Sequence, residues 1–277
     1  MYFEKIIEKF SSLNEVEAIA LGGSRATGAN DKKSDYDIYV YTTDEISVST
    51  KRDILSECCD IMEISNHYWE LEDNCIMKDG IEIDIIYRSI DRMSSFIGEV
   101  VEKHTALNGY TTCFWHNVVT CKVLFDRNGR LQAMKERFTV PYPQELKKNI
   151  IKRNMNLLSG CLPSYDKQIA KTVARGDFVS VNHRLAAFLE SYFDIIFALN
   201  EKTHPGEKRL VEMAKKQCEI LPKDFEENLD ELFKVMYTEN MNEVIKRIYS
   251  EFYRGQSLEI YCGRFENYAD RYDICGI

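Results

Sequence analysis

The sequence predicts an α+β protein in which a domain built on a small mixed β-sheet flanked by helices precedes an all-α helical bundle. The first half alternates short strand-like runs with helical patterns, whereas the second half reads as long helices. The change falls at two closely spaced prolines in PYPQELKKNIIKRNMNLLSG, which begins at Pro141. We therefore predict domains at residues 1–140 and 141–277.

Length and composition favour a globular protein of two domains. The 277 residues include 44% hydrophobic and 29% charged side chains, a balance typical of folded chains. No apolar run is long enough to span a bilayer, and MYFEKIIEKF carries charges where a signal peptide needs its apolar segment. We therefore expect a cytoplasmic protein that does not contact membranes.

The charge limits the class of substrate. A formal net charge of -9 and a sequence pI near 5.2 oppose a broad nucleic-acid surface, which requires clustered Lys and Arg. A small cationic acceptor is easier to reconcile with this charge.

The nine cysteines show no CxxC pair. An odd total without such spacing predicts neither a disulfide framework nor a zinc site, so we expect reduced and mostly buried thiols. The nine are Cys58, Cys59, Cys75, Cys113, Cys121, Cys161, Cys218, Cys262 and Cys275.

Apolar periodicity defines the elements of the first half, since alternation indicates strands and a spacing of three or four indicates helices. The first predicted strand runs directly into Gly22 and Gly23, and Asn128-Gly129 marks a turn before another helix. The predicted elements are a helix at 3–13, strands at 15–21, 35–41, 61–65 and 81–87, and a helix at 94–104.

The second half contains few signals beyond helix periodicity. After the helix that follows Pro141, long helices are predicted at 178–200, 207–219, 224–236 and 240–253. Pro205-Gly206 is a helix-start signal for the second of these. Arg175, His183 and Lys208 could contact a substrate, but ordinary structural roles are favoured for them.

The stretch LGGSRATGANDKKSDYDIYVY contains the candidate metal ligands. Because strand side chains alternate between faces, Asp35 and Asp37 share one face and their carboxylates are neighbours. Two carboxylates this close repel each other, and a divalent cation that prefers oxygen ligands relieves the repulsion. The spacing therefore predicts a Mg²⁺ site.

The glycines before these aspartates indicate an anion site. Gly22 and Gly23 form a turn without side chains that exposes backbone N–H groups, and a helix from Ser24 would direct its positive end at an anion. A phosphate on the turn beside a metal on the carboxylates is the arrangement of a bound nucleoside triphosphate.

A third acid is expected from GIEIDIIYR, where alternation places Glu82 and Asp84 on one face of a strand. Asp84 is favoured because apolar residues enclose it, whereas Glu82 lies nearer the Asp79-Gly80 turn and solvent. Whether Glu82 assists or replaces Asp84 stays open.

This combination resembles the DNA polymerase beta-like nucleotidyltransferase superfamily. A short catalytic domain followed by a helical domain is similar to the bacterial branch that includes aminoglycoside and lincosamide nucleotidyltransferases. CKVLFDRNGRL and ALNEKTHPGEKRL carry a further resemblance to a bacterial group with the same order of halves. The residues that carry the superfamily resemblance are Gly22, Gly23, Ser24, Asp35, Asp37 and Asp84.

The resemblance implies transfer of a nucleoside monophosphate, AMP from ATP in the leading case, to a hydroxyl with release of pyrophosphate. Asp35 and Asp37 would hold two Mg²⁺ ions, and Asp84 would complete the second metal site and help deprotonate the acceptor. The helical domain would cover the substrate and nucleotide cleft.

The resemblance also implies roles around the phosphates. The backbone of Gly23, next to Gly22, and the Ser24 side chain would bind the β and γ phosphates, while Arg25 would neutralise the departing pyrophosphate. Arg25 could instead cap or pair with a neighbour, and Lys32 and Lys33 are expected in a solvated loop.

The acceptor is left open by the sequence, as are the preferred nucleotide and the oligomeric state. An aminoglycoside or lincosamide antibiotic is the leading acceptor. An antitoxin-like enzyme that modifies a partner protein is the alternative, disfavoured by the complete helical domain. The intact acids argue against a noncatalytic nucleotide-binding module, and the negative charge argues against transfer RNA as acceptor.

Overall fold

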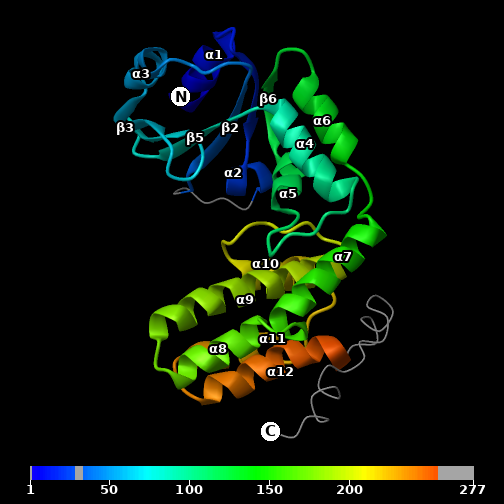
Figure 1. The fold of residues 1–277 in the computed structure, drawn as a ribbon. Coiled ribbons are helices and arrows are strands. Elements are labelled where there is room, and N and C mark those ends of the chain that lie inside the picture. Colours follow the sequence, from blue (N-terminus) through cyan, green and yellow to red (C-terminus); the bar gives the residue numbers. More distant parts are fainter. Residues whose placement is uncertain (1, 29–33, 255–277) are drawn as a thin grey trace, which may run out of the picture. The chain divides into compact units, whose positions relative to one another are not determined.

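The computed structural model describes residues 2–28 and 34–254, which form two compact units (Figure 1). Within these limits the first unit contains residues up to 98 and residues 114–141, and the second contains residues 99–113 and those from 142 onward. The predictions for Lys32, Lys33, Cys262 and Cys275 lie outside the described residues.

The first unit is built on a six-stranded sheet in the order β3-β4-β5-β2-β1-β6. β2 and β5 run parallel and the other neighbours antiparallel, so the predicted mixed sheet is confirmed. Two strands, β4 and β6, were not predicted. The strands are β1 (Val16–Leu21), β2 (Tyr36–Thr42), β3 (Cys59–Asn66), β4 (Glu72–Met77), β5 (Glu82–Arg88) and β6 (Lys122–Asp126).

Helices cover both faces of this sheet. Figure 1 shows α1 and α3 together on one side of the sheet and α4 and α6 on the other. The core lies under α1 and α3, where Phe10, Ile38 and Ile83 are fully buried. The helices are α1 (Tyr2–Ser12), α2 (Gly23–Thr27), α3 (Val48–Ser56), α4 (Ile90–Val101), α5 (Cys113–Thr120) and α6 (Arg130–Phe138).

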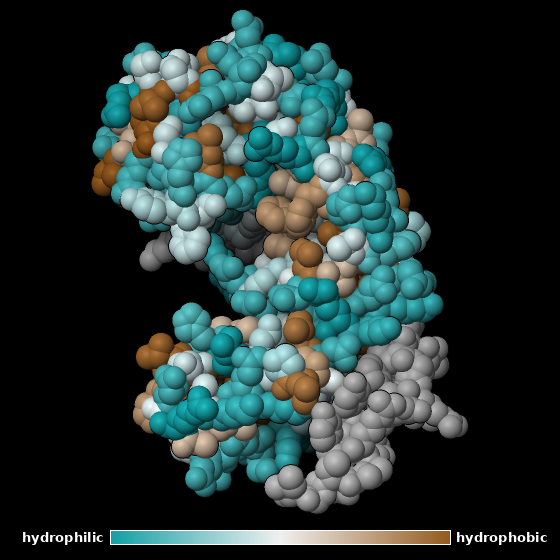
Figure 2. Space-filling view, in the orientation of Figure 1, coloured by the Kyte–Doolittle hydropathy of each residue, from teal (hydrophilic) through white to brown (hydrophobic). Residues whose placement is uncertain are grey.

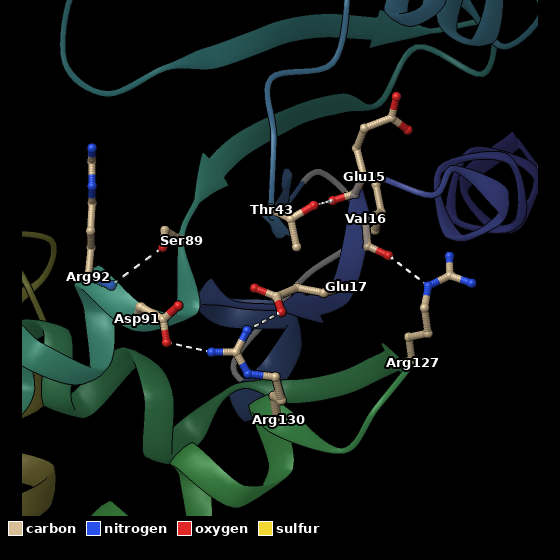
Figure 3. Close-up of polar contacts among 9 residues, drawn as sticks. All are labelled: Glu15, Val16, Glu17, Thr43, Ser89, Asp91, Arg92, Arg127 and Arg130. Atoms are coloured by element: carbon tan, nitrogen blue, oxygen red, sulfur yellow. Dashed lines mark hydrogen bonds and ion pairs between the residues drawn. The ribbon is translucent and has the colours of Figure 1, made fainter.

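Arginines fix the end of the sheet that lies far from the glycine turn (Figure 3). Arg127 donates from Nε to the Val16 carbonyl at 3.1 Å. Arg130 donates to Glu17 at 2.7 Å and also pairs with Asp91. These bonds join the first residues of β1 to the start of α4 and α6.

The edge strand β3 carries apolar surface. Figure 2 shows hydrophobic side chains at the margin of the first unit where Figure 1 places β3, and Ile61 of this strand is 57% exposed. The turn between β3 and β4 adds Tyr68 and Trp69, both strongly exposed. This margin of the sheet therefore exposes large apolar side chains to solvent.

The second unit is helical, as predicted. No helix within residues 2–28 and 34–254 is both long and apolar enough to cross a bilayer. The elements are α7 (Gln144–Met155), a π-helical turn η1 (Asn156–Gly160), α8 (Tyr165–Ala174), α9 (Phe178–Leu199), α10 (Leu210–Gln217), α11 (Phe225–Lys234) and α12 (Asn240–Arg254).

The start predicted for the helix at 207–219 is wrong. α10 begins at Leu210, because Gly206 has φ 107° and Arg209 has φ 55°, both in the left-handed region that a helix cannot include. Pro205-Gly206 therefore belongs to the loop before the helix.

Residues 99–113 cluster with the helical unit, although the sequence places them in the first domain. Asp194 of α9 accepts hydrogen bonds from the Thr111 N–H at 3.1 Å and the Thr111 hydroxyl at 2.6 Å. The His204 N–H donates to Thr112 at 2.7 Å. These buried hydrogen bonds attach residues 99–113 to the helical unit.

The described cysteines agree with the expectation of reduced thiols. Seven are free, and five of these are buried.

Candidate active site

Three aspartates meet on the face of the sheet opposite the core, where β2 lies parallel to β5. The register pairs Asp37 with Asp84, and Asp35 directly precedes β2. One carboxylate oxygen from each lies within 4.8 Å of the others, and all three side chains are half-buried. Oxygens around Mg²⁺ at roughly 2.1 Å are about 3–4 Å apart, so this donor set fits a small cation that prefers oxygen ligands.

The glycine turn lies directly against Asp37. The Gly22 N–H donates to the Asp37 carbonyl at 2.7 Å. A Cβ built on Gly23 would lie 1.9 Å from Asp37 Oδ2, and one on Gly22 would lie 2.6 Å from the Tyr39 ring. Gly23 also has φ 60°. Because neither glycine carries a side chain, the turn can lie this close to the Asp37 carboxylate and the Tyr39 ring.

Two short elements deviate slightly from expectation near this turn. α2 begins at Gly23, ahead of the predicted Ser24, and has only five residues. β2 begins at Tyr36, so Asp35 lies just outside the strand that was predicted to include it. The three acids still converge, because Asp35 is held by a separate contact.

That contact comes from Arg25. Its Nε donates to the Ser34 carbonyl at 3.0 Å and to the Asp35 carbonyl at 2.9 Å. The guanidinium lies 3.9 Å from the centroid of the Tyr36 ring, which in turn stacks on Phe3. Arg25 thus holds the backbone that presents Asp35, a contact with neighbouring residues of the kind that the sequence analysis gave as the alternative to a phosphate role.

Asp84 has a partner that the sequence analysis missed. Asn74 of β4 is paired in register with Asp84, and its Nδ2 donates to Asp84 Oδ1 at 2.8 Å. No strand was predicted at β4, so the neighbour of Asp84 on this side could not be named.

Two further charged residues share this face. Glu72 lies two residues before Asn74 on β4 and is paired with Ile86. Burial raises the pKa of the Glu72 carboxyl, and the charges of Asp84 and Glu70 raise it further. Arg88 of β5 pairs with Glu70, and its buried Nη1 has no hydrogen-bond partner among the described residues. Arg88 could have been found from the alternation of IEIDIIYR, which places it on the face of Asp84.

The other predicted candidates lie outside the trio. Glu82 is the first residue of β5, is exposed, and is paired with Ile76. Arg175, His183 and Lys208 are exposed side chains of the helical unit.

Comparison with known proteins identifies the family. Residues 4–102 match the family model described as polymerase beta, nucleotidyltransferase, and this segment contains the glycine turn and all three acids. This segment is a nucleotidyltransferase domain of the polymerase beta-like superfamily. The domain makes the protein a transferase. Residues 113–210 of this nucleotidyltransferase match a domain of unknown function, DUF4037, which includes both CKVLFDRNGRL and ALNEKTHPGEKRL.

Solved structures show only distant similarity to the nucleotidyltransferase. A nucleotidyltransferase-like protein from Exiguobacterium sibiricum is 11% identical, with a TM-score of 0.42 over 95% of this chain and 76% of that one. An aminoglycoside 6-adenyltransferase from Bacillus subtilis is 11% identical, with a TM-score of 0.30 over 92% and 89%. A CCA-adding enzyme from Thermotoga maritima, complexed with tRNA, is 12% identical, with a TM-score of 0.29 over 99% and 86%. No curated protein matches the sequence.

Proposed function

We propose that this nucleotidyltransferase transfers a nucleoside monophosphate, AMP from ATP in the leading case, to a hydroxyl of a small molecule. The observation that carries the proposal is the contact between the Gly22-Gly23 turn and Asp37, beside Asp35 and Asp84. A turn without side chains next to clustered carboxylates suits a metal-bound triphosphate. The net charge of -9 supports a cationic acceptor, such as an aminoglycoside or lincosamide antibiotic.

Mg²⁺ is the proposed metal, with two ions held by Asp35, Asp37 and Asp84. When bound, the ions would neutralise charge on the phosphates and make the acceptor hydroxyl more acidic. Without such a cation the three carboxylates repel one another, so the protein itself favours occupancy of the site.

The chain positions the remaining groups. The backbone N–H of Gly23 and the Ser24 side chain would bind the β and γ phosphates, and Arg25 would add positive charge on that side while its Nε holds Asp35. Asp84 would accept the proton of the acceptor hydroxyl while Asn74 holds its carboxylate through Oδ1. The hydroxyl oxygen then bonds to the α phosphorus, the bond to the bridging oxygen breaks, and its electron pair leaves with pyrophosphate.

The test is an assay with each of the four α-labelled ribonucleoside triphosphates, Mg²⁺, and a panel of aminoglycosides, lincosamides and neutral sugars. We expect label on a cationic acceptor, stoichiometric pyrophosphate, and loss of both in Asp37→Asn. Label on protein but on no small molecule would replace this proposal with the partner-protein alternative. Failure of the protein to bind any triphosphate in the presence of Mg²⁺ would overturn it.

A further inference from the structure

The carboxamide of Asn74 bridges two residues on the active face of the sheet. Its Nδ2 donates to Asp84 Oδ1 at 2.8 Å, and its Oδ1 accepts from Asn66 Nδ2. An ionised carboxylate only accepts hydrogen bonds, so the group that faces Asp84 must be the NH₂. Asn66 then receives the carbonyl end. The two partners together select one orientation of the Asn74 amide.

Asn66 reaches this face because β3 contains a bulge. Glu63 pairs with Asn74, whereas Asn66 pairs with Glu72, so β3 has one residue more than β4 between these pairs. Strict alternation would direct Glu63 and Asn66 to opposite faces. The extra residue restores Asn66 to the face that Glu63, Asn74 and Asp84 share.

A buried ion pair on the opposite face holds the bulge. Ser65 has φ 59°, and its N–H donates to Asp73 Oδ1 at 2.7 Å. Lys51 Nζ donates to Ser65 Oγ at 3.1 Å and lies 3.3 Å from Asp73 Oδ1. The Tyr87 hydroxyl donates to Asp73 Oδ2 at 2.6 Å. Because Lys51 and Asp73 are almost completely buried, the left-handed backbone at Ser65 is firmly fixed.

We propose that Asn74 is a positioning residue for the metal ligand Asp84, and that Asn66 holds Asn74 in the orientation this requires. The inference rests on the proposed function, because it assumes that Asp84 binds the metal. The bond from Asn74 to Oδ1 fixes the rotation of the Asp84 carboxylate, which lies beside Asp35 and Asp37. Without the amide the Asp84 side chain is free to rotate, and the metal ligands are no longer preorganised.

The experiment measures Mn²⁺ binding by electron paramagnetic resonance, in the presence of an α,β-methylene triphosphate that cannot turn over. Asn74→Leu removes the donor at similar volume and should weaken Mn²⁺ about 10- to 100-fold, the usual cost of removing the partner of a metal ligand. Asn66→Leu should weaken it by a smaller factor. Glu63→Gln is the matched control, since Glu63 is exposed on the same face and pairs with Asn74, and should bind as wild type does.

A double variant separates positioning from general damage to the fold. Asn74→Leu in an Asp84→Asn background should cost nothing further, because the group that Asn74 positions is no longer a carboxylate. Wild-type Mn²⁺ affinity in folded Asn74→Leu would overturn the positioning role alone. If Asn74→Leu does not fold, unchanged affinity in Asn66→Leu would overturn it instead. A wild-type protein that binds no Mn²⁺ would overturn both this role and the proposed function.

Discussion

Asp73 and Asp84 lie on adjacent strands of one sheet and face opposite sides of it. Asp73 is completely buried, and its oxygens accept from the Ser65 N–H, the Tyr87 hydroxyl and Lys51. Asp84 is half-buried, and its donor among the described residues is Asn74. A carboxylate whose acceptor sites are filled by the protein contributes to structure, whereas one with remaining sites beside other acids is suited to bind a ligand.

The largest expected effect is a loss of activity when Asp84, the half-buried carboxylate, is replaced. Asp84→Asn keeps the shape of the side chain but removes a negative charge, so we expect the rate of nucleotidyl transfer to fall on the order of 10³-fold. The free energy of unfolding should stay the same or rise, because one of three repelling charges is gone. Single-turnover kinetics and urea denaturation measure the two. A rate within tenfold of wild type would remove Asp84 from the site.

The reverse pattern is expected at the buried carboxylate. Asp73→Asn leaves the Lys51 ammonium buried without its counter-ion, which typically costs about 3–5 kcal/mol of unfolding free energy. Asp60→Asn, at an exposed position of β3, should change it by no more than about 0.5 kcal/mol. Urea denaturation of both variants checks the difference. If Asp73→Asn proved as mild as the control, the ion pair would not be what holds the bulge at Ser65.

These two aspartates also show how far the sequence leads. The alternation in DYDIYVY and IEIDIIY was enough to predict β2, β5 and the convergence of the three acids, because each strand has one apolar face. β4 escaped prediction because Glu72, Asp73 and Asn74 are consecutive polar residues, so neither face appears apolar. Asp73 itself and Asn74, the partner of Asp84, were missed with that strand.

The bulge at Ser65 could not be predicted from the sequence for a different reason. A left-handed residue is expected at Gly or Asn, and nothing local marks Ser65 for it. Its conformation depends on Lys51, which is fourteen residues earlier and in a helix that was not predicted. Positions that depend on contacts across the core leave no periodic signal in the chain.

The helical unit contains another buried acid, Asp194, which can be compared with Asp73. Asp194 accepts hydrogen bonds from Thr111 and Asn154, both neutral. Burial raises the pKa of Asp194 to about 7, although these hydrogen bonds act in the opposite direction. The neutral donors thus offset the burial of the Asp194 carboxylate only in part.

The raised pKa predicts a pH-dependent stability. Between its unfolded pKa near 4 and its folded pKa, Asp194 retains a proton in the folded state that it loses on unfolding, so stability falls as pH rises through this window and is level above it. Relative to Asp194→Asn, the wild type should lose about 2–3 kcal/mol between pH 5 and pH 8. Urea denaturation at the two pH values measures the difference. An equal difference at both would mean that Asp194 titrates as an exposed acid does.

The smallest effect is expected at Glu82, which shares the active face with Asp84 but is exposed at the start of β5 and lies outside the acidic trio. Solvent screens its charge, and within residues 2–28 and 34–254 no buried partner orients it toward Asp35 and Asp37, so Glu82→Gln should change kcat/KM for the triphosphate less than about threefold. A Mg²⁺ titration of the same variant should have an unchanged midpoint. A loss comparable to that of Asp84→Asn would mean that Glu82 binds the metal in its place. An exposed acid at a strand end would then be the ligand, and the half-buried position beside Asn74 would no longer distinguish a binding carboxylate from a structural one.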